Sequence, residues 1–158
     1  MAESIVERLA PLRAKALAKL EDLRWLGQLV GRLGVGLVFL STGWGKVHSI
    51  DKVTAFFTEL HIPAPHFHAI FIGYTELVCG AAIVLGLMTR LSAIPLAVSM
   101  VVAIATARMK DLHGLFDLVG FEEFTYLVIL VMLVILGPGK ASIDNALAKK
   151  YFPEKSTK

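Results

Sequence analysis

The feature that most constrains this chain is its set of long apolar segments with few or no charged residues. Residues 91–107 contain no Asp, Glu, Lys or Arg. A helix on the surface of a water-soluble protein carries polar residues along its outward face, whereas an uncharged stretch of this length is typical of a helix surrounded by lipid. Hydrophobic residues make up 56% of the chain, which is a membrane composition. The chain is therefore expected to be an integral membrane protein.

Four apolar segments have lengths near the roughly 20 residues that a helix needs to cross about 30 Å of hydrocarbon. The predicted spans cover residues 26–46, 68–88, 91–107 and 121–136. Backbone polar groups in lipid must be paired within their own segment, so each span is expected to be helical. The predicted fold is an all-α, integral membrane four-helix bundle, with the membrane domain at residues 29–139.

Shorter segments flank and connect these spans. Residues 1–28 are expected to be cytoplasmic and to contain an amphipathic helix that begins at Pro11 and lies on the membrane surface, with a solvated leader as the alternative. Apolar residues at helical spacing between Ile50 and Leu60 predict a short helix in the external loop. Residues 140–158 form a predicted cytoplasmic tail, in which Ser142 can cap a last helix.

The distribution of Lys and Arg predicts the orientation of the bundle. With an even number of spans, one side receives twelve of the 16 basic residues and the other side receives four. Cytoplasmic segments carry the excess of Lys and Arg, so both termini are expected in the cytoplasm. All five histidines then fall on the external side.

Glu76 is the residue most informative about function, because it lies well inside an otherwise uncharged span. A carboxylate at that depth is costly unless it is protonated or paired, so it is expected to face the bundle interior. Gly73 and Gly80 share its helical face and would let a neighbouring helix approach closely. Glu76 either handles a ligand or protons, or forms a structural ion pair or hydrogen bond that fixes helix packing.

Charged residues of other spans are expected to converge near Glu76. Lys46 lies at the external end of the first span, close to where the second span enters, so it is the predicted partner; the alternative is a lysine that anchors the helix at the interface. One of two glutamates that begin the fourth span is expected to turn inward, with Arg108 as a counter-charge. The result is a polar pocket suited to a small amphipathic molecule from the lipid, whose candidate residues are Arg32, Lys46, Glu76, Glu122 and Glu123.

Other functions receive less support. His61, His66 and His68 could bind a metal such as copper if the loop folded them together, but their spacing matches no closed ligand set, and interfacial or solvent-facing histidines are the preferred interpretation. The basic residues form no patch interleaved with aromatics, so nucleic acid is not an expected partner. The sequence contains no phosphate loop, nucleophile elbow, dinucleotide fingerprint, HExxH or haem motif.

A series of motifs along the chain resembles the DoxX family of four-helix bacterial membrane proteins. These are R-x-G-x-G-x-x-F at residues 32–39, S-T-G-W-G-K at 41–46, E-L-V-C-G at 76–80, L-G-L-M-T-R at 85–90 and G-P-G-K-A-S-I-D at 137–144. The charged positions that recur in the family match Arg32, Lys46, Glu76, Arg90 and either Glu122 or Glu123.

The resemblance implies a multi-pass protein of the bacterial inner membrane that is associated with redox or detoxification reactions. On this interpretation the chain is a quinone-interacting subunit without a covalently bound cofactor. Lys46 and Glu76 would hold the quinone head group, and a soluble or membrane partner protein would supply electrons. The alternatives are a non-enzymatic protein for assembly, anchoring or small-molecule transport, and an external metal-handling protein. An enzymatic activity of its own and a homo-oligomeric state both stay open.

Overall fold

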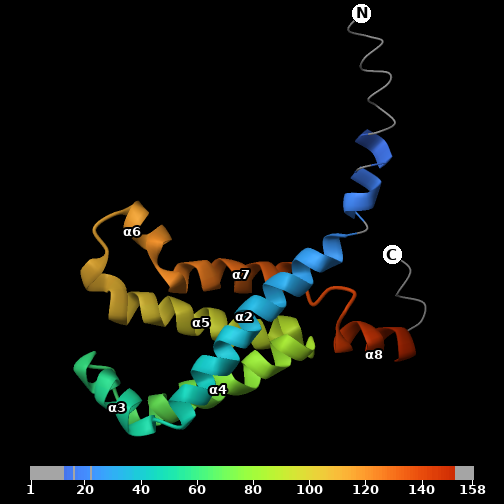
Figure 1. Ribbon diagram of the computed structural model, residues 1–158. Helices are drawn as coiled ribbons and strands as arrows, with labels where there is room; N and C mark the ends of the chain where they lie inside the picture. The colour runs from blue at the N-terminus through green and yellow to red at the C-terminus, as the bar shows by residue number, and fades with distance from the viewer. Residues whose placement is uncertain (1–12, 16, 22, 152–158) are drawn as a thin grey trace, which may run out of the picture.

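The computed structural model describes residues 13–15, 17–21 and 23–151, and in these ranges the chain is α-helical without β-strands. An elongated bundle is built from four helices, α2 (Arg24–Val47), α4 (Pro65–Leu85), α5 (Thr89–Ala103) and α7 (Glu122–Leu136) (Figure 1). The expected all-α membrane fold is confirmed. The amphipathic helix predicted from Pro11 begins outside the described residues, and residues 13–15 and 17–21 are helical.

The length of each helix indicates whether it can cross a membrane. Within the described part of the chain, three helices are long and apolar enough to cross a membrane: α2, α4 and the continuous helix Thr89–Asp111 that begins with α5. Helix α7 has 15 residues, which is about 22 Å at a rise of 1.5 Å per residue. Since α7 packs along α5, it belongs to the bundle. A fourth crossing stays a prediction.

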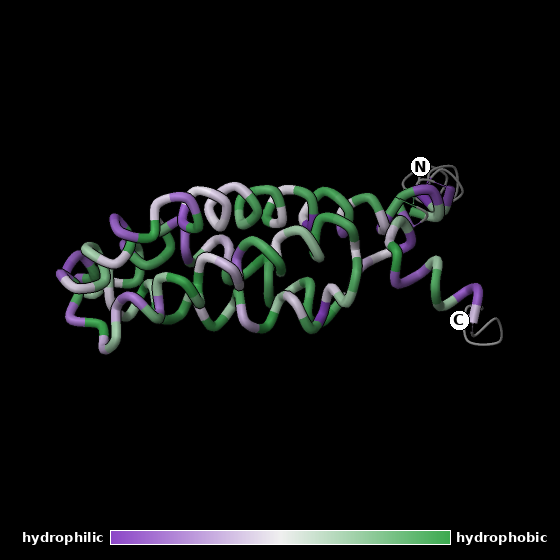
Figure 2. Tube along the Cα trace, turned by 90° about the horizontal axis from the view of Figure 1, so that it is seen from below, coloured by the Kyte–Doolittle hydropathy of each residue, from purple (hydrophilic) through white to green (hydrophobic). Residues whose placement is uncertain are grey.

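Apolar side chains hold the four helices together. The core consists of Val35, Phe39, Ile83, Ala93, Leu96, Met100, Leu130 and Leu133. The outer faces are apolar as well, and Figure 2 shows hydrophobic residues along the length of the bundle with hydrophilic residues concentrated at its ends. A surface of this kind is unfavourable in water and fits contact with lipid.

Helices α2 and α4 form the most extensive helix contact in the bundle, and glycines allow it. A Cβ atom on Gly80 would lie 2.6 Å from the backbone nitrogen of Leu40. A Cβ atom on Gly43 would likewise meet the backbone of Leu77. Small residues at such positions let membrane helices approach closely, as was predicted for Gly80. The two backbones therefore run in direct contact past Glu76.

The short helices lie at the two ends of the bundle (Figure 1). The predicted loop helix is confirmed as α3 (Ile50–Glu59), which packs on α4. At the same end, α6 (Leu115–Gly120) was not predicted, and its Phe116 side chain is 92% exposed. Helix α8 (Ile143–Tyr151) lies at the opposite end.

Helix α8 is tied to the turn between α4 and α5. The predicted cap is confirmed, because the Asn145 backbone N–H donates to Ser142 Oγ at 3.1 Å. The Asp144 carboxylate accepts hydrogen bonds from the backbone N–H groups of Met88 at 2.8 Å and Thr89 at 3.2 Å. The carboxylate thus satisfies free N–H groups at the start of α5.

Candidate functional site

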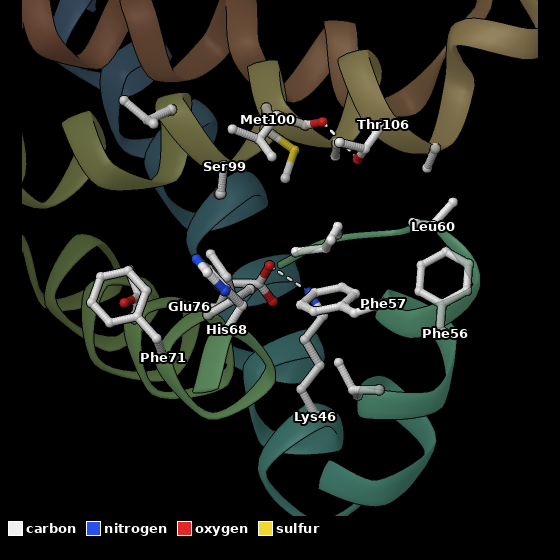
Figure 3. Close-up of a pocket in the computed structure, with 18 of the residues that line it drawn as sticks. Lys46, Phe56, Phe57, Leu60, His68, Phe71, Glu76, Ser99, Met100 and Thr106 are labelled. Carbon is white, nitrogen blue, oxygen red and sulfur yellow. Dashed lines mark hydrogen bonds and ion pairs between the residues drawn. The ribbon is translucent and has the colours of Figure 1, made fainter. Parts of the chain in front are cut away.

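A cavity of about 1180 Å³ lies at the end of the bundle that carries α3. Figure 3 shows Ser99, Met100 and Thr106 on one side of it, with Lys46 and Glu76 on the other. Most of the remaining lining is apolar or aromatic and comes from α3, α4 and α5. Pockets that hold drug-sized molecules have volumes of about 300–1,000 Å³ and mostly apolar walls with a few polar groups. The cavity is therefore large enough for an aromatic amphiphile.

Glu76 is buried inside the bundle and fully paired. Lys46 Nζ donates to Glu76 Oε1 at 2.5 Å, and Thr42 Oγ1 donates to Oε2 at 3.0 Å. The Glu76 side chain is 2% exposed and that of Lys46 is 30% exposed. A buried carboxylate is tolerated when both oxygens have donors, especially when one donor is a cation. The prediction that Glu76 faces the interior against Lys46 is confirmed.

Thr42 was not predicted to belong to this site. Thr42 lies four residues before Lys46, so both side chains project from the same face of α2. Gly43 lies next to it, where α2 contacts α4. The i, i+4 spacing within S-T-G-W-G-K was the available signal.

A second ion pair lines the same cavity. Arg108 Nε donates to Glu123 Oε1 at 3.0 Å, while Glu123 Oε2 is buried without a hydrogen-bond partner among the described residues. Of the two predicted glutamates, Glu123 turns inward; Glu122 is exposed and does not line the cavity. Arg108 ends a π-helical turn, Ile104–Arg108, and such turns occur often at functional sites. Nothing in the hydrophobic pattern predicted this turn.

Arg32 does not belong to this cavity, and its inclusion in the predicted pocket was wrong. Arg32 and Lys46 share one face of α2, but they lie about 21 Å apart along the helix at a rise of 1.5 Å per residue. The buried Arg32 guanidinium instead donates from Nη1 to the Pro138 carbonyl at 2.8 Å and from Nη2 to the Ala141 carbonyl at 2.7 Å. It holds the loop between α7 and α8.

Replacing Arg32 with Lys is expected to lower the free energy of unfolding by about 1–3 kcal/mol, because an ammonium cannot reproduce the two-pronged contact and one buried carbonyl loses its donor. The effect is measured by detergent-induced unfolding followed by circular dichroism. Arg24→Lys is the control, since Arg24 pairs with Glu21 at the exposed surface. Equal stability of Arg32→Lys and the unmodified protein would contradict this role.

The loop histidines do not come together. His61 and His68 line the cavity, whereas His66 does not; its Nδ1 lies 3.4 Å from Thr54 Oγ1. His68 Nδ1 lies 3.2 Å from the Ala64 carbonyl, one turn earlier in the chain. Among the residues that the structure describes, no three His, Cys, Asp or Glu side chains lie close enough to hold a metal ion.

Fold and site together define an all-α membrane protein in which an ion pair buried between two helices lines a largely apolar cavity. The chain belongs to the DoxX family, whose model matches residues 27–109. The matched segment contains Arg32 and the Lys46–Glu76 pair, and it ends just after Arg108.

Named relatives agree with a membrane location. The chain is 38% identical over 130 residues to an "Uncharacterized membrane protein" of Mycobacterium tuberculosis, covering 75% of this chain and 80% of that protein. It is 29% identical over 133 residues to the "Inner membrane protein YqjF" of Escherichia coli, covering 84% and 98%. It is also 29% identical over 126 residues to the "Putative oxidoreductase CatD" of Bacillus subtilis, covering 78% and 89%. No solved structure matches the chain.

Proposed function

We propose that this protein binds a quinone or a similar aromatic amphiphile in the cavity, as the quinone-interacting inner-membrane subunit of a redox or detoxification system. The observation that carries the proposal is the Lys46–Glu76 ion pair, which lines an otherwise largely apolar cavity. The relative named as an oxidoreductase gives independent support for redox work.

The chemistry of the ion pair suits a quinone head group. Lys46 Nζ has three N–H donors, and one of them donates a hydrogen bond to Glu76. A second N–H can therefore donate to a quinone carbonyl. Reduction of a quinone to a hydroquinone consumes two electrons and two protons. Lys46 and Glu76 are groups that can pass protons to the two oxygens. The sequence has no dinucleotide fingerprint or haem motif, so a partner protein is assigned to supply the electrons.

The proposal is tested by titrating the purified protein in lipid nanodiscs with a radiolabelled benzoquinone analogue. We expect saturable binding that weakens about tenfold or more in Lys46→Met and in Glu76→Gln, since each change removes a charge-assisted contact. Absence of saturable binding, or an affinity in both variants equal to that of the unmodified protein, would contradict the proposal. The ion pair would then be structural, and a non-enzymatic role in assembly, anchoring or transport would take first place.

The two adjacent glutamates of α7 offer a matched pair of variants. Glu123→Gln is expected to weaken binding of the same analogue about threefold to tenfold, because Arg108 loses its partner at the cavity wall. Glu122→Gln removes the same charge from an exposed position outside the cavity and is expected to leave the affinity unchanged. Equal effects in the two variants would show that charge alone matters and that Glu123 does not contribute to the site.

We further propose that both termini lie in the cytoplasm, as the distribution of Lys and Arg indicates. Helices α3 and α8 lie at opposite ends of the bundle (Figure 1), so one engineered cysteine on each reports the orientation. In a Cys79→Ser background, an impermeant maleimide added to right-side-out membrane vesicles is expected to label Glu59→Cys on α3 and not Lys149→Cys on α8. Labelling of Lys149→Cys alone would reverse the orientation.

A further inference from the structure

A groove of about 590 Å³ lies beside the cavity on α4 and α5. Its wall on α4 includes Phe67, Tyr74 and Val78, and its lining is almost entirely apolar. Phe71, Thr75 and Pro95 line both the groove and the cavity, so the two spaces adjoin each other. Figure 3 shows Phe71 on the same helix as Glu76, projecting away from the ion pair.

The groove is on the outer surface of the bundle. Phe67, Phe71, Tyr74 and Val78 follow one another at spacings of four, three and four residues, which places them on one face of α4. All four side chains are more than half exposed. Because α4 is one of the helices that can cross a membrane, this face is turned toward lipid.

The groove and the cavity both lie against α4 and α5. α5 contacts α4 much less extensively than α2 does. Pro95 lies inside α5. Because proline has no backbone N–H, α5 lacks one hydrogen bond to the preceding turn at this position. The shared residues thus place the lipid-facing groove next to the cavity that holds Lys46 and Glu76.

We propose that the groove binds the hydrocarbon tail of the ligand whose head group occupies the cavity. This inference rests on the proposed function and narrows its ligand class: a polar aromatic head joined to an apolar tail, a molecule that resides in the membrane and enters sideways between α4 and α5. A small water-soluble aromatic would use the cavity and leave the groove to ordinary lipid chains.

The test compares two probes in nanodiscs, decylbenzoquinone and the same head group without the decyl chain, each dosed per lipid. The measured quantity is the affinity for decylbenzoquinone divided by the affinity for the probe without the decyl chain. This ratio gives the contribution of the decyl chain to binding. Tyr74→Ala and Val78→Ala are each expected to lower this ratio about threefold to tenfold and to leave the affinity of the chainless probe unchanged. Both side chains are exposed, so both variants should fold.

Ile94→Ala is the matched control, because Ile94 is an exposed apolar residue of α5 that lines neither space. Its affinity ratio is expected to equal that of the unmodified protein. If the decyl chain adds equally to affinity in all four proteins, ordinary acyl chains occupy the groove and the inference is overturned while the proposed function stands. Failure of both probes to bind overturns the proposed function and this inference with it.

Discussion

Replacing Lys46 with Met is expected to destabilise the protein by about 3 kcal/mol, toward the low end of the roughly 3–5 kcal/mol that breaking a buried ion pair costs. Glu76 would keep only the hydrogen bond from Thr42 while remaining 2% exposed. The low end applies because the Lys46 side chain is 30% exposed and water partly screens the pair. Unfolding in mixed micelles, followed by circular dichroism, measures the loss.

Two further variants separate the cost of leaving the Glu76 carboxylate unpaired from the cost of losing the Lys46 side chain itself. In Glu76→Gln the side chain can still accept and donate hydrogen bonds, so it is expected to cost less than Lys46→Met. The double variant Lys46→Met/Glu76→Gln removes both charges and should recover most of the stability, because no unpaired charge stays buried. A double variant as unstable as the sum of its single variants would mean that the two residues act independently.

Adding one methyl group at Gly80 is expected to have a comparably large effect. The Cβ atom of Gly80→Ala would lie 2.6 Å from the Leu40 nitrogen and 2.9 Å from the Phe39 carbonyl carbon. Backbone atoms cannot move aside as a flexible side chain can, so α2 and α4 must separate. We expect the free energy of unfolding to fall by about 1–3 kcal/mol, the usual range for overpacking. The same unfolding assay measures this change.

The chain supplies controls on the other face of α2. Within the part of the chain that the structure describes, a Cβ atom on Gly34 or Gly45 would meet no atom within 4 Å. Gly34→Ala and Gly45→Ala are therefore expected to be neutral or to stabilise the helix by up to about 1 kcal/mol, since Ala favours helix more than Gly does. A loss of stability in these controls equal to that in Gly80→Ala would show that the α2–α4 contact is not the cause.

The helical segments were predicted well from the sequence, because a segment that crosses lipid must be apolar, roughly 20 residues long and helical. The first predicted span, residues 26–46, differs from α2 by two residues at one end and by one at the other. The sequence missed α6, whose six residues are too few for a periodic pattern. It also missed the π-helical turn at Ile104–Arg108, which keeps the same apolar composition as the rest of its helix.

The candidate site was predicted in part. The pairing of Glu76 with Lys46 could be predicted from the sequence, because an unpaired charge in lipid is costly and few charged residues lie near Glu76 to pair with it. Arg32 was wrongly assigned to the pocket because it shares one face of α2 with Lys46. A shared helix face gives the direction of a side chain, but it does not show at which end of the bundle the side chain makes its contacts. The choice between Glu122 and Glu123 depends on where α7 begins, and helix boundaries are poorly predicted from sequence.

The contacts of Arg32 have a consequence for the biogenesis of this protein. Its two acceptors, the carbonyls of Pro138 and Ala141, follow it by 106 and 109 residues. A ribosome synthesises α2 long before it reaches these residues, so α2 is made while its buried cation still lacks its final acceptors. Water or lipid head groups at the membrane surface must solvate Arg32 in the interval. The final packing of α2 is thus expected to follow the synthesis of residues 138–141.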